Sequence, residues 1–198
     1  SIVTYKLDGL LLTKTLDSLI DAIGRANKHG LLAQNDPAQM TIIDNGGNAE
    51  PIDDIVDSIE ARQDININVI CNDTNAGYGR AHNQAIMSSN ADIHLILNPD
   101  VELDNDALKE GLAHLAENNQ SALLGPSGRD KNNNPAKLAK RYPTLLDLFL
   151  RGFAPGFIKN RFAERLAYYE CSDLDDLRRV QVPIISGCMV LGRTDLLQ

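Results

Sequence analysis

The 198-residue chain has no tryptophan, few other aromatic residues and only three cysteines. Cys71, Cys171 and Cys188 are odd in number, widely spaced and outside any Cys-x-x-Cys or Cys/His pattern, which argues against a disulfide framework and against a zinc site. Nor does the sequence contain a run of about 18 uncharged apolar residues, so it predicts no transmembrane helix. These absences fit a protein of the reducing cytoplasm.

Basic residues are also scarce, with 19 Lys and Arg against 27 Asp and Glu, and the formal net charge is -8. Broad binding to a nucleic-acid backbone requires a basic surface, so the composition predicts no nucleic-acid partner. The hydrophobic content of 43% is ordinary for a globular domain. The chain lacks an initiator Met and the basic-then-apolar order of a signal peptide, so we expect its true start to precede Ser1.

Short apolar runs alternate with stretches of helical spacing in the first part of the chain. The expected strands are Ser1–Tyr5, Met40–Asp44, Ile67–Cys71 and Ile93–Leu97. The expected helices run from Leu12 towards Gly30, over Pro51–Arg62, over Gly79–Ser89, and around Leu108, Leu112 and Leu115. This alternation predicts an α/β fold with a mainly parallel sheet flanked by helices.

The remainder of the chain is less regular. The polar, Pro-containing stretch 129–144 is predicted to be an exposed loop, and a role as a lid or acceptor loop is one interpretation. Leu145–Leu166 combines Leu and Phe with basic residues and is broken by Gly and Pro, which predicts two short amphipathic helices. Val180–Leu191 is the last apolar strand region, and Ser186 and Gly187 interrupt it.

Polar residues follow each of the predicted strands. In open parallel sheets, ligands bind beyond the carboxyl ends of the strands. The candidate site is therefore expected among the stretches 4–6, 44–48, 72–80 and 98–100.

The stretch Asn98-Pro99-Asp100 follows the predicted strand IHLIL and precedes another apolar residue. Oxygen ligands at alternate positions can face the same way, which suits a hard cation that carries a diphosphate. A purely structural alternative is that Pro99 turns the chain while Asp104 or Asn105 caps the following helix.

A glycine-rich stretch, NDTNAGYGRAHNQAI, follows the third predicted strand. Gly77 and Gly79 permit close approach of the backbone to a ligand, and Arg80, with Asn83 nearby, offers donors to a phosphate or a base. The alternative is a turn with a solvated arginine. Asp44 can accept a hydrogen bond from a pyrimidine N–H, although the Asn-Gly after it is also a strong turn signal. The four histidines show no ligand spacing, which disfavours a catalytic histidine.

In this order the segments resemble family two glycosyltransferases, in particular the bacterial rhamnosyltransferase-like branch that builds surface polysaccharides. The matching strings are VTYK, IIDNGG, NAGYGRAHNQAI, LNPDVEL, GP, KRYPT and ISGCMVLGRTDLL, which span nearly the whole chain. The resemblance implies a single GT-A domain over residues 1–198. Its nucleotide-binding half would be 1–126, and 127–198 would be the incomplete start of an acceptor-side half.

The resemblance also implies which residues contact the nucleotide sugar. They are Thr4, Tyr5, Asp44, Arg80, Asn83, Asn98, Ser186 and Gly187. Thr4, Tyr5 and Asp44 would line the nucleoside pocket, and Arg80 and Asn83 would support the base or the diphosphate. Ser186 and Gly187 would lie near the donor sugar and the acceptor, where small residues leave room.

A metal ion belongs to the same expectation. Asn98-Pro99-Asp100 would replace the usual Asp-x-Asp motif, with Asp100 as the principal ligand of Mg²⁺ or Mn²⁺ on the diphosphate. Loss of the first carboxylate is expected to weaken metal affinity.

By this resemblance the protein is expected to be an inverting glycosyltransferase, a hexosyltransferase of polysaccharide or cell-wall biosynthesis. It would move a sugar from dTDP-rhamnose or a UDP-sugar to a saccharide or lipid-linked acceptor, with a catalytic carboxylate expected beyond Gln198. The basic, Leu- and Phe-bearing stretch 145–166 would allow peripheral contact with the inner face of the membrane. The alternatives are a nucleotide-sugar-binding protein without transferase activity, a sugar nucleotidyltransferase, and a structural or interaction protein.

Overall fold

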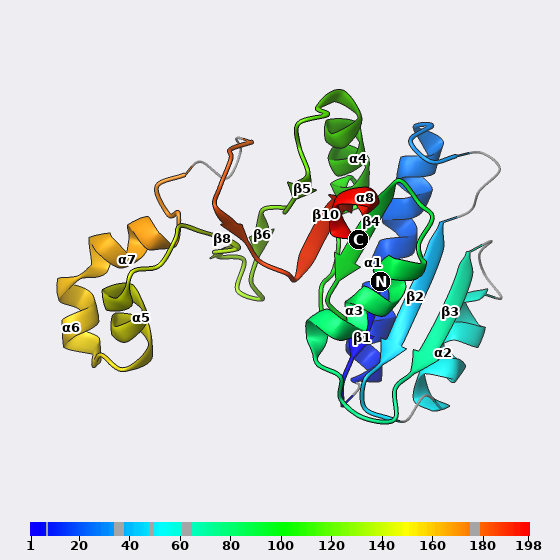
Figure 1. Ribbon diagram of the computed structural model, residues 1–198, viewed down its shortest axis with the longest axis horizontal. Coiled ribbons are helices and arrows are strands. Elements are labelled where there is room, and N and C mark those ends of the chain that lie inside the picture. Colours follow the sequence, from blue (N-terminus) through cyan, green and yellow to red (C-terminus); the bar gives the residue numbers. More distant parts are fainter. Residues whose placement is uncertain (7, 34–37, 48–49, 61–64, 175–178) are drawn as a thin grey trace. The chain divides into compact units, whose positions relative to one another are not determined.

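The computed structural model describes the chain except for residues 7, 34–37, 48–49, 61–64 and 175–178. It contains two compact units. The sheet unit comprises residues 1–124 and 187–198, and the helical unit comprises residues 125–186. The helical unit is therefore inserted into the chain of the sheet unit, between strands β5 (Leu123–Leu124) and β10 (Met189–Arg193) (Figure 1).

The sheet unit is built on a six-stranded sheet of order β3-β2-β1-β4-β10-β5. The strands β1 (Ile2–Thr4), β2 (Gln39–Asp44), β3 (Asn66–Cys71) and β4 (Ile93–Leu97) are parallel. Among the described strands of this sheet, β10 is antiparallel to both of its neighbours, β4 and β5. The predicted α/β fold with a mainly parallel sheet is confirmed.

Helices cover both faces of this sheet (Figure 1). Helices α1 (Gly9–Lys28), α2 (Glu50–Glu60) and α4 (Ala107–Glu117) enclose the larger hydrophobic cluster on one face. Helix α3 (Tyr78–Ser88) covers the other face, where Ala81 and Ala85 contact Val3 and Ile43. The short helix α8 (Thr194–Leu197) follows β10. The end of the helix predicted over 51–62 falls within 61–64 and so lies outside the described residues.

Helix α1 shows why the periodicity of the sequence predicted these elements correctly. Its first turn is capped by Asp8, whose carboxylate accepts hydrogen bonds from the backbone N–H groups of Leu10 (3.1 Å) and Leu11 (3.2 Å). Leu12 and Leu16 lie one turn apart on the same face and are completely buried.

The helical unit differs from its predicted structure in two places. The stretch 129–144, predicted as a loop, contributes to two small sheets: β6 (Gly128–Arg129) pairs with β7 (Pro135–Ala136), and β8 (Ala139–Lys140) pairs with β9 (Ile184–Ile185). The Asp130 carboxylate accepts the N–H groups of Asn132 (2.8 Å) and Asn134 (2.9 Å), which closes the turn between β6 and β7.

The stretch 145–166 was predicted to contain two helices, and the structure has three over a slightly longer range. They are α5 (Leu145–Gly152), α6 (Gly156–Arg161) and α7 (Ala163–Tyr169). The break before Gly156 occurs where the prediction placed it. The second break comes at Phe162, which ends α6 and begins α7, and no Gly or Pro marks it. Within the described residues, no helix combines the length and the apolar character needed to cross a bilayer.

Candidate functional site

The candidate site lies where four parallel strands end at one edge of the sheet. The register places Thr4 of β1 opposite Asp44 of β2, and Asp44 opposite Cys71 of β3. Asn98 follows β4, the other neighbour of β1. The chain forms β1, β2 and β3 on one side before it crosses to β4, so the strand order reverses between β1 and β4. Open α/β sheets bind ligands at such a reversal.

Asp44 is a buried carboxylate at this edge, with 3% of its surface exposed. Its Oδ1 accepts the backbone N–H of Gly46 at 3.0 Å and lies 3.4 Å from the Thr4 hydroxyl, which donates to it. The following Gly47 has a φ of 80°, a value that favours glycine, so the Asn-Gly turn predicted here is present. The Asp44 carboxylate therefore helps to hold the turn that follows it. This arrangement is compatible with a purely structural role for Asp44 and also with the predicted hydrogen bond to a pyrimidine.

Asn45 connects the loops that follow β2 and β3. Its Oδ1 accepts from the Asn72 side chain (3.1 Å) and from the backbone N–H of Ala76 (3.0 Å), and its Nδ2 donates to Asn75 Oδ1 at 2.7 Å. The Asn45 side chain is almost completely buried. Asn75 in turn accepts the N–H of Gly77, the residue before α3. This chain of amides fixes the start of α3 against the end of β2.

Tyr78 begins α3 and connects three parts of the site. Its hydroxyl donates to the Gly187 carbonyl at 2.6 Å and lies 3.0 Å from Asn98 Oδ1. Burial raises the pKa of Tyr78 to about 12, and the nearby Cys188 and Asp100 add to the shift. The hydroxyl is therefore protonated at neutral pH and acts as a hydrogen-bond donor.

Two histidines lie behind Tyr78 in the sheet unit. The His82 ring meets the Tyr78 ring edge to face, with centroids 4.5 Å apart, and Ser1 Oγ lies 2.8 Å from both His82 Nδ1 and His94 Nε2. Burial is the main cause that lowers the pKa of each imidazole to about 4. Both rings are therefore neutral at physiological pH.

The remaining predicted residues of the sheet unit are more exposed. Tyr5, Arg80, Asn83 and Asp100 all face solvent, and no hydrogen bond joins any of them to another predicted site residue in the described part of the chain. Arg80 and Asn83 lie on the side of α3 away from its buried residues. The structure thus brings together Thr4 and Asp44, and joins Asn98 to Gly187 through Tyr78. Ser186 belongs to the helical unit, where its N–H donates to the Leu138 carbonyl at 2.7 Å.

The end of β4 carries two side chains whose oxygen atoms are of the type that would bind a divalent cation together with a diphosphate. Asp100 offers an exposed carboxylate, and Asn98 offers an amide oxygen two residues earlier. The described residues contain no cluster of three or more acidic, His or Cys side chains suited to a metal. Mg²⁺ commonly uses one or two carboxylates and takes its other ligands from phosphate and water, so this sparse donor set suits a metal that arrives with the nucleotide.

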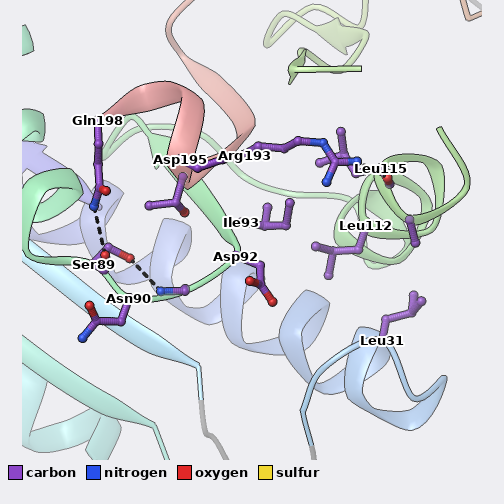
Figure 2. Close-up of a pocket in the computed structure, with 13 residues that line it drawn as sticks. Leu31, Ser89, Asn90, Asp92, Ile93, Leu112, Leu115, Arg193, Asp195 and Gln198 are labelled. Atoms are coloured by element: carbon purple, nitrogen blue, oxygen red, sulfur yellow. Dashed lines mark hydrogen bonds between the residues drawn. The ribbon is translucent and has the colours of Figure 1, made fainter. Parts of the chain in front are cut away.

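A pocket of about 670 Å³ lies at the opposite edge of the sheet unit (Figure 2). Its lining includes Asp92 and Ile93, at the start of β4, and Arg193, at the end of antiparallel β10. The Arg193 guanidinium donates to the carbonyl groups of Leu115 (2.6 Å) and Ser121 (3.2 Å), so it already has backbone partners. This pocket is separate from the strand ends that carry the predicted site.

The prediction from sequence missed Asn45 and Tyr78 as site-building residues. Both fall in or beside the polar stretches that follow strands, which is the signal that would have led to them. Their roles depend on partners 20 to 109 residues away in sequence, which no local pattern reveals.

Comparison with known proteins agrees with this architecture. The model of the glycosyl transferase family 2 domain matches residues 2–198. The chain belongs to glycosyl transferase family 2. No curated protein sequence matches it. Membership of this family confirms the broader part of the predicted resemblance, whereas the rhamnosyltransferase-like branch remains a prediction.

Two solved structures share the fold of this family 2 chain. One is the mannosyltransferase PcManGT from Pyrobaculum calidifontis in complex with GDP-Man and Mn²⁺, with a TM-score of 0.59 and 16% identity over 99% of the present chain. The other is TarS from S. aureus, with a TM-score of 0.54 and 17% identity over 99% of the present chain. The chain spans 44% and 46% of their respective lengths. At these identities the likeness establishes the fold, which is that of GT-A glycosyltransferases.

Proposed function

We propose that this family 2 chain binds a nucleoside-diphosphate sugar at the carboxyl edge of its sheet, as the donor-binding part of an inverting glycosyltransferase. The observation that carries the proposal is the coincidence of the strand-order reversal between β1 and β4 with the polar residues Thr4, Asp44 and Asn98. The start of α3 at the same edge adds free backbone N–H groups and the positive end of a helix dipole, both of which favour a diphosphate.

We assign the nucleoside to the side of the site formed by Thr4, Tyr5 and Asp44. Tyr5 is half exposed and offers a ring face for a base, while Asp44 holds a fixed carboxylate next to the Gly46 turn. Arg80 and Asn83 on α3 are the proposed contacts to the base or the diphosphate, because both are exposed and have side chains free to reorient.

We assign the diphosphate and the donor sugar to the side formed by Asn98, Asp100 and Gly187. Asp100 would hold Mg²⁺ or Mn²⁺, and Asn98 would contact the diphosphate. When bound, the metal would neutralise charge that develops on the departing diphosphate. Tyr78 keeps Gly187 beside Asn98, and Gly187 leaves room for a sugar because it has no side chain.

The full reaction and its partners are also part of the proposal. The donor is dTDP-rhamnose or a UDP-sugar, and the acceptor is a saccharide or lipid-linked saccharide of polysaccharide or cell-wall biosynthesis in the cytoplasm. Residues 1–126 would form the nucleotide-binding half and 127–198 the start of the acceptor-side half, with membrane contact through 145–166. The acceptor hydroxyl would attack the anomeric carbon opposite the diphosphate while a carboxylate takes its proton. We assign no catalytic base within residues 1–198.

A binding screen tests the proposed donor site. We expect dTDP- and UDP-sugars to raise the melting temperature of the protein in the presence of Mn²⁺, because a ligand that binds only the folded state stabilises it. A tenfold excess over the dissociation constant corresponds to about 1.4 kcal/mol of stabilisation. The control repeats the screen with EDTA in place of Mn²⁺. If no nucleoside diphosphate or nucleotide sugar shifts the melting temperature under either condition, the proposed donor site is wrong.

A second prediction concerns Tyr78, whose hydroxyl donates to Gly187. We expect Tyr78→Phe to lower the free energy of unfolding by about 0.5–1.5 kcal/mol, since the substitution removes the hydroxyl that donates to the Gly187 carbonyl. Nucleotide-sugar affinity should fall while the affinity for the free nucleoside falls less, because Gly187 is assigned to the sugar. Calorimetric titration of both ligands measures this difference.

The matched control is Tyr142→Phe, which removes the same atom from a tyrosine that is 75% exposed. It should leave both stability and affinity unchanged. Equal losses of sugar and nucleoside affinity in Tyr78→Phe would contradict the assignment of Gly187 to the sugar side.

A further inference from the structure

Helix α5 of the helical unit presents an unusually apolar face to solvent. Leu145, Leu148, Phe149 and Phe153 follow the spacing of one helical face, and all four are exposed, Leu145 to 87% and Phe153 to 80%. The Phe149 and Phe153 rings stack with centroids 6.1 Å apart. Phe157 of α6 is 75% exposed. Large apolar groups gathered in this way on a surface mark an interaction site.

The opposite face of α5 is the one that packs into the helical unit. It buries Leu150 and the carboxylate of Asp147. Asp147 closes a capping box with Thr144, and Arg165 donates to Asp147 Oδ1 at 2.7 Å. The Thr144 N–H holds the pKa of Asp147 below its usual value, with Arg165 adding to the shift, so this buried carboxylate is ionised. The helix thus buries Leu150 and a paired carboxylate, whereas several of its large apolar side chains face solvent, which is unusual for a surface helix.

The charge around this apolar face differs in sign from that of the whole protein. Between residues 137 and 165 the chain has seven basic and two acidic residues, whereas its net charge is -8. Three of these basic residues form ion pairs, Lys137 with Glu170, Arg141 with Asp173 and Arg165 with Asp147. Lys159 and Arg161 of α6 lie beside the exposed phenylalanines in sequence, and Arg151 lies between Phe149 and Phe153. The acidic Asp147 is buried and paired with Arg165, so it contributes little negative charge to this surface.

We infer that the exposed face formed by Leu145, Leu148, Phe149, Phe153 and Phe157, with Lys159 and Arg161, lies in the headgroup region of an anionic lipid bilayer. Apolar and aromatic side chains enter the boundary between headgroups and acyl chains, while basic groups at the sides contact lipid phosphates. Charge complementarity favours this occupant over a second copy of the chain, because two copies facing each other would oppose equal basic groups. Helices of six and eight residues can lie on a bilayer but cannot span it.

This inference deepens the membrane contact proposed above for residues 145–166. It concerns a different surface from the donor site and needs no nucleotide. It also gives a physical reason for a lipid-linked acceptor. A protein held at a bilayer by this face would meet an acceptor that is confined to the same bilayer.

Vesicle flotation tests the inference. The protein is mixed with vesicles of phosphatidylcholine alone, or of phosphatidylcholine and phosphatidylglycerol in equal parts, and the floated fraction is measured. We expect flotation with the anionic vesicles and much less with the neutral ones. Phe153→Ser/Phe157→Ser should lower the partition coefficient roughly tenfold or more, since two buried phenyl groups are lost. Lys159→Gln/Arg161→Gln should remove most of the dependence on anionic lipid.

The matched controls change equivalent residues elsewhere. Leu10→Ser/Met87→Ser removes two apolar side chains that are 68% and 64% exposed in the sheet unit, and it should float as the original protein does. Lys14→Gln/Lys131→Gln removes two exposed charges outside 145–166. Melting curves establish that each variant is folded. Absence of flotation, or equal flotation of all variants, would overturn the inference. So would a concentration-dependent dimer that Phe153→Ser/Phe157→Ser abolishes, because the face would then bind a second copy.

The outcome is independent of the donor site. Nucleotide binding is measured by melting temperature without vesicles, and flotation is measured without nucleotide. Either proposal can therefore fail while the other holds.

Discussion

Replacing Asp100 with alanine is expected to remove the metal-dependent part of nucleotide binding while leaving the fold intact. Asp100 is exposed, and its carboxylate forms no ion pair with any other described residue, so its loss should cost little stability. Losing one charged ligand should weaken binding of a nucleoside diphosphate in Mn²⁺ roughly tenfold or more, equivalent to about 1.5–3 kcal/mol. The affinity of Asp100→Ala in Mn²⁺ should then equal that of the original protein in EDTA.

Calorimetric titration with and without Mn²⁺ measures this effect, and β4 supplies its control. Asp92 precedes the strand and Asp100 follows it, and both carboxylates are exposed. Asp92→Ala removes the same charge at the opposite edge of the sheet and should leave metal-dependent binding unchanged. Asn98→Asp should strengthen that dependence, because it adds a carboxylate at the position where the family motif usually has one. If folded Asp100→Ala keeps its full metal-dependent affinity, the proposed role of Asp100 is wrong.

The central sheet could be predicted from the sequence because its strands are continuous apolar runs between helical stretches. Ile42 and Ile43 are both completely buried, as expected for a strand covered on both faces. The strands β5 to β9 have only two residues each, and so short a segment carries no alternating pattern. Their pairing depends on local turns such as that at Asp130, and on contacts between distant segments, such as β8 with β9.

The location of the candidate site could be predicted from the sequence, but the burial and hydrogen bonds of its residues could not. The rule that ligands bind beyond strand ends indicated the correct edge, because the positions after β1, β2 and β4 all carry polar residues. The sequence could not show that Asp44 is buried and already bonded to Gly46, since burial depends on the turn above it. Nor could it show that Tyr78 reaches Gly187, because residues 109 positions apart meet only in the folded sheet unit.

The sequence indicates Asn45 only as part of a turn. Asn-Gly after a strand is a strong turn signal, and a turn is present. The Asn45 side chain has a further role, which depends on partners that only the folded chain brings close to it. It supplies both an acceptor and a donor to the loop after β3, so the start of α3 depends on it.

Asn45→Ala is accordingly expected to be the most destabilising single change at the site. Asn45 is buried, and its three hydrogen bonds are partly buried. The substitution leaves Asn72 Nδ2 and the Ala76 N–H without their acceptor, and Asn75 Oδ1 without the donor from Asn45. Buried polar groups left without partners cost about 1–3 kcal/mol each, partly offset where water can enter. We expect a total loss of about 2–4 kcal/mol, which lowers the melting temperature by roughly 5–15 °C in a protein of this size.

Two further variants distinguish the loss of the Asn45 hydrogen bonds from the loss of an amide side chain in general. Asn83→Ala removes an exposed amide from α3 and should leave the melting temperature unchanged. Asn45→Asp keeps the acceptor for Ala76 but loses the donor to Asn75 and buries a charge, so it should also be destabilised, and more so at pH 7 than at pH 4. Nucleotide affinity should fall in both Asn45 variants, measured well below their melting temperatures, because the N–H groups that begin α3 lose their fixed position. If Asn45→Ala melts at the same temperature as Asn83→Ala, the amide network does not hold these loops together, and the start of α3 must be positioned by its contacts with the sheet alone.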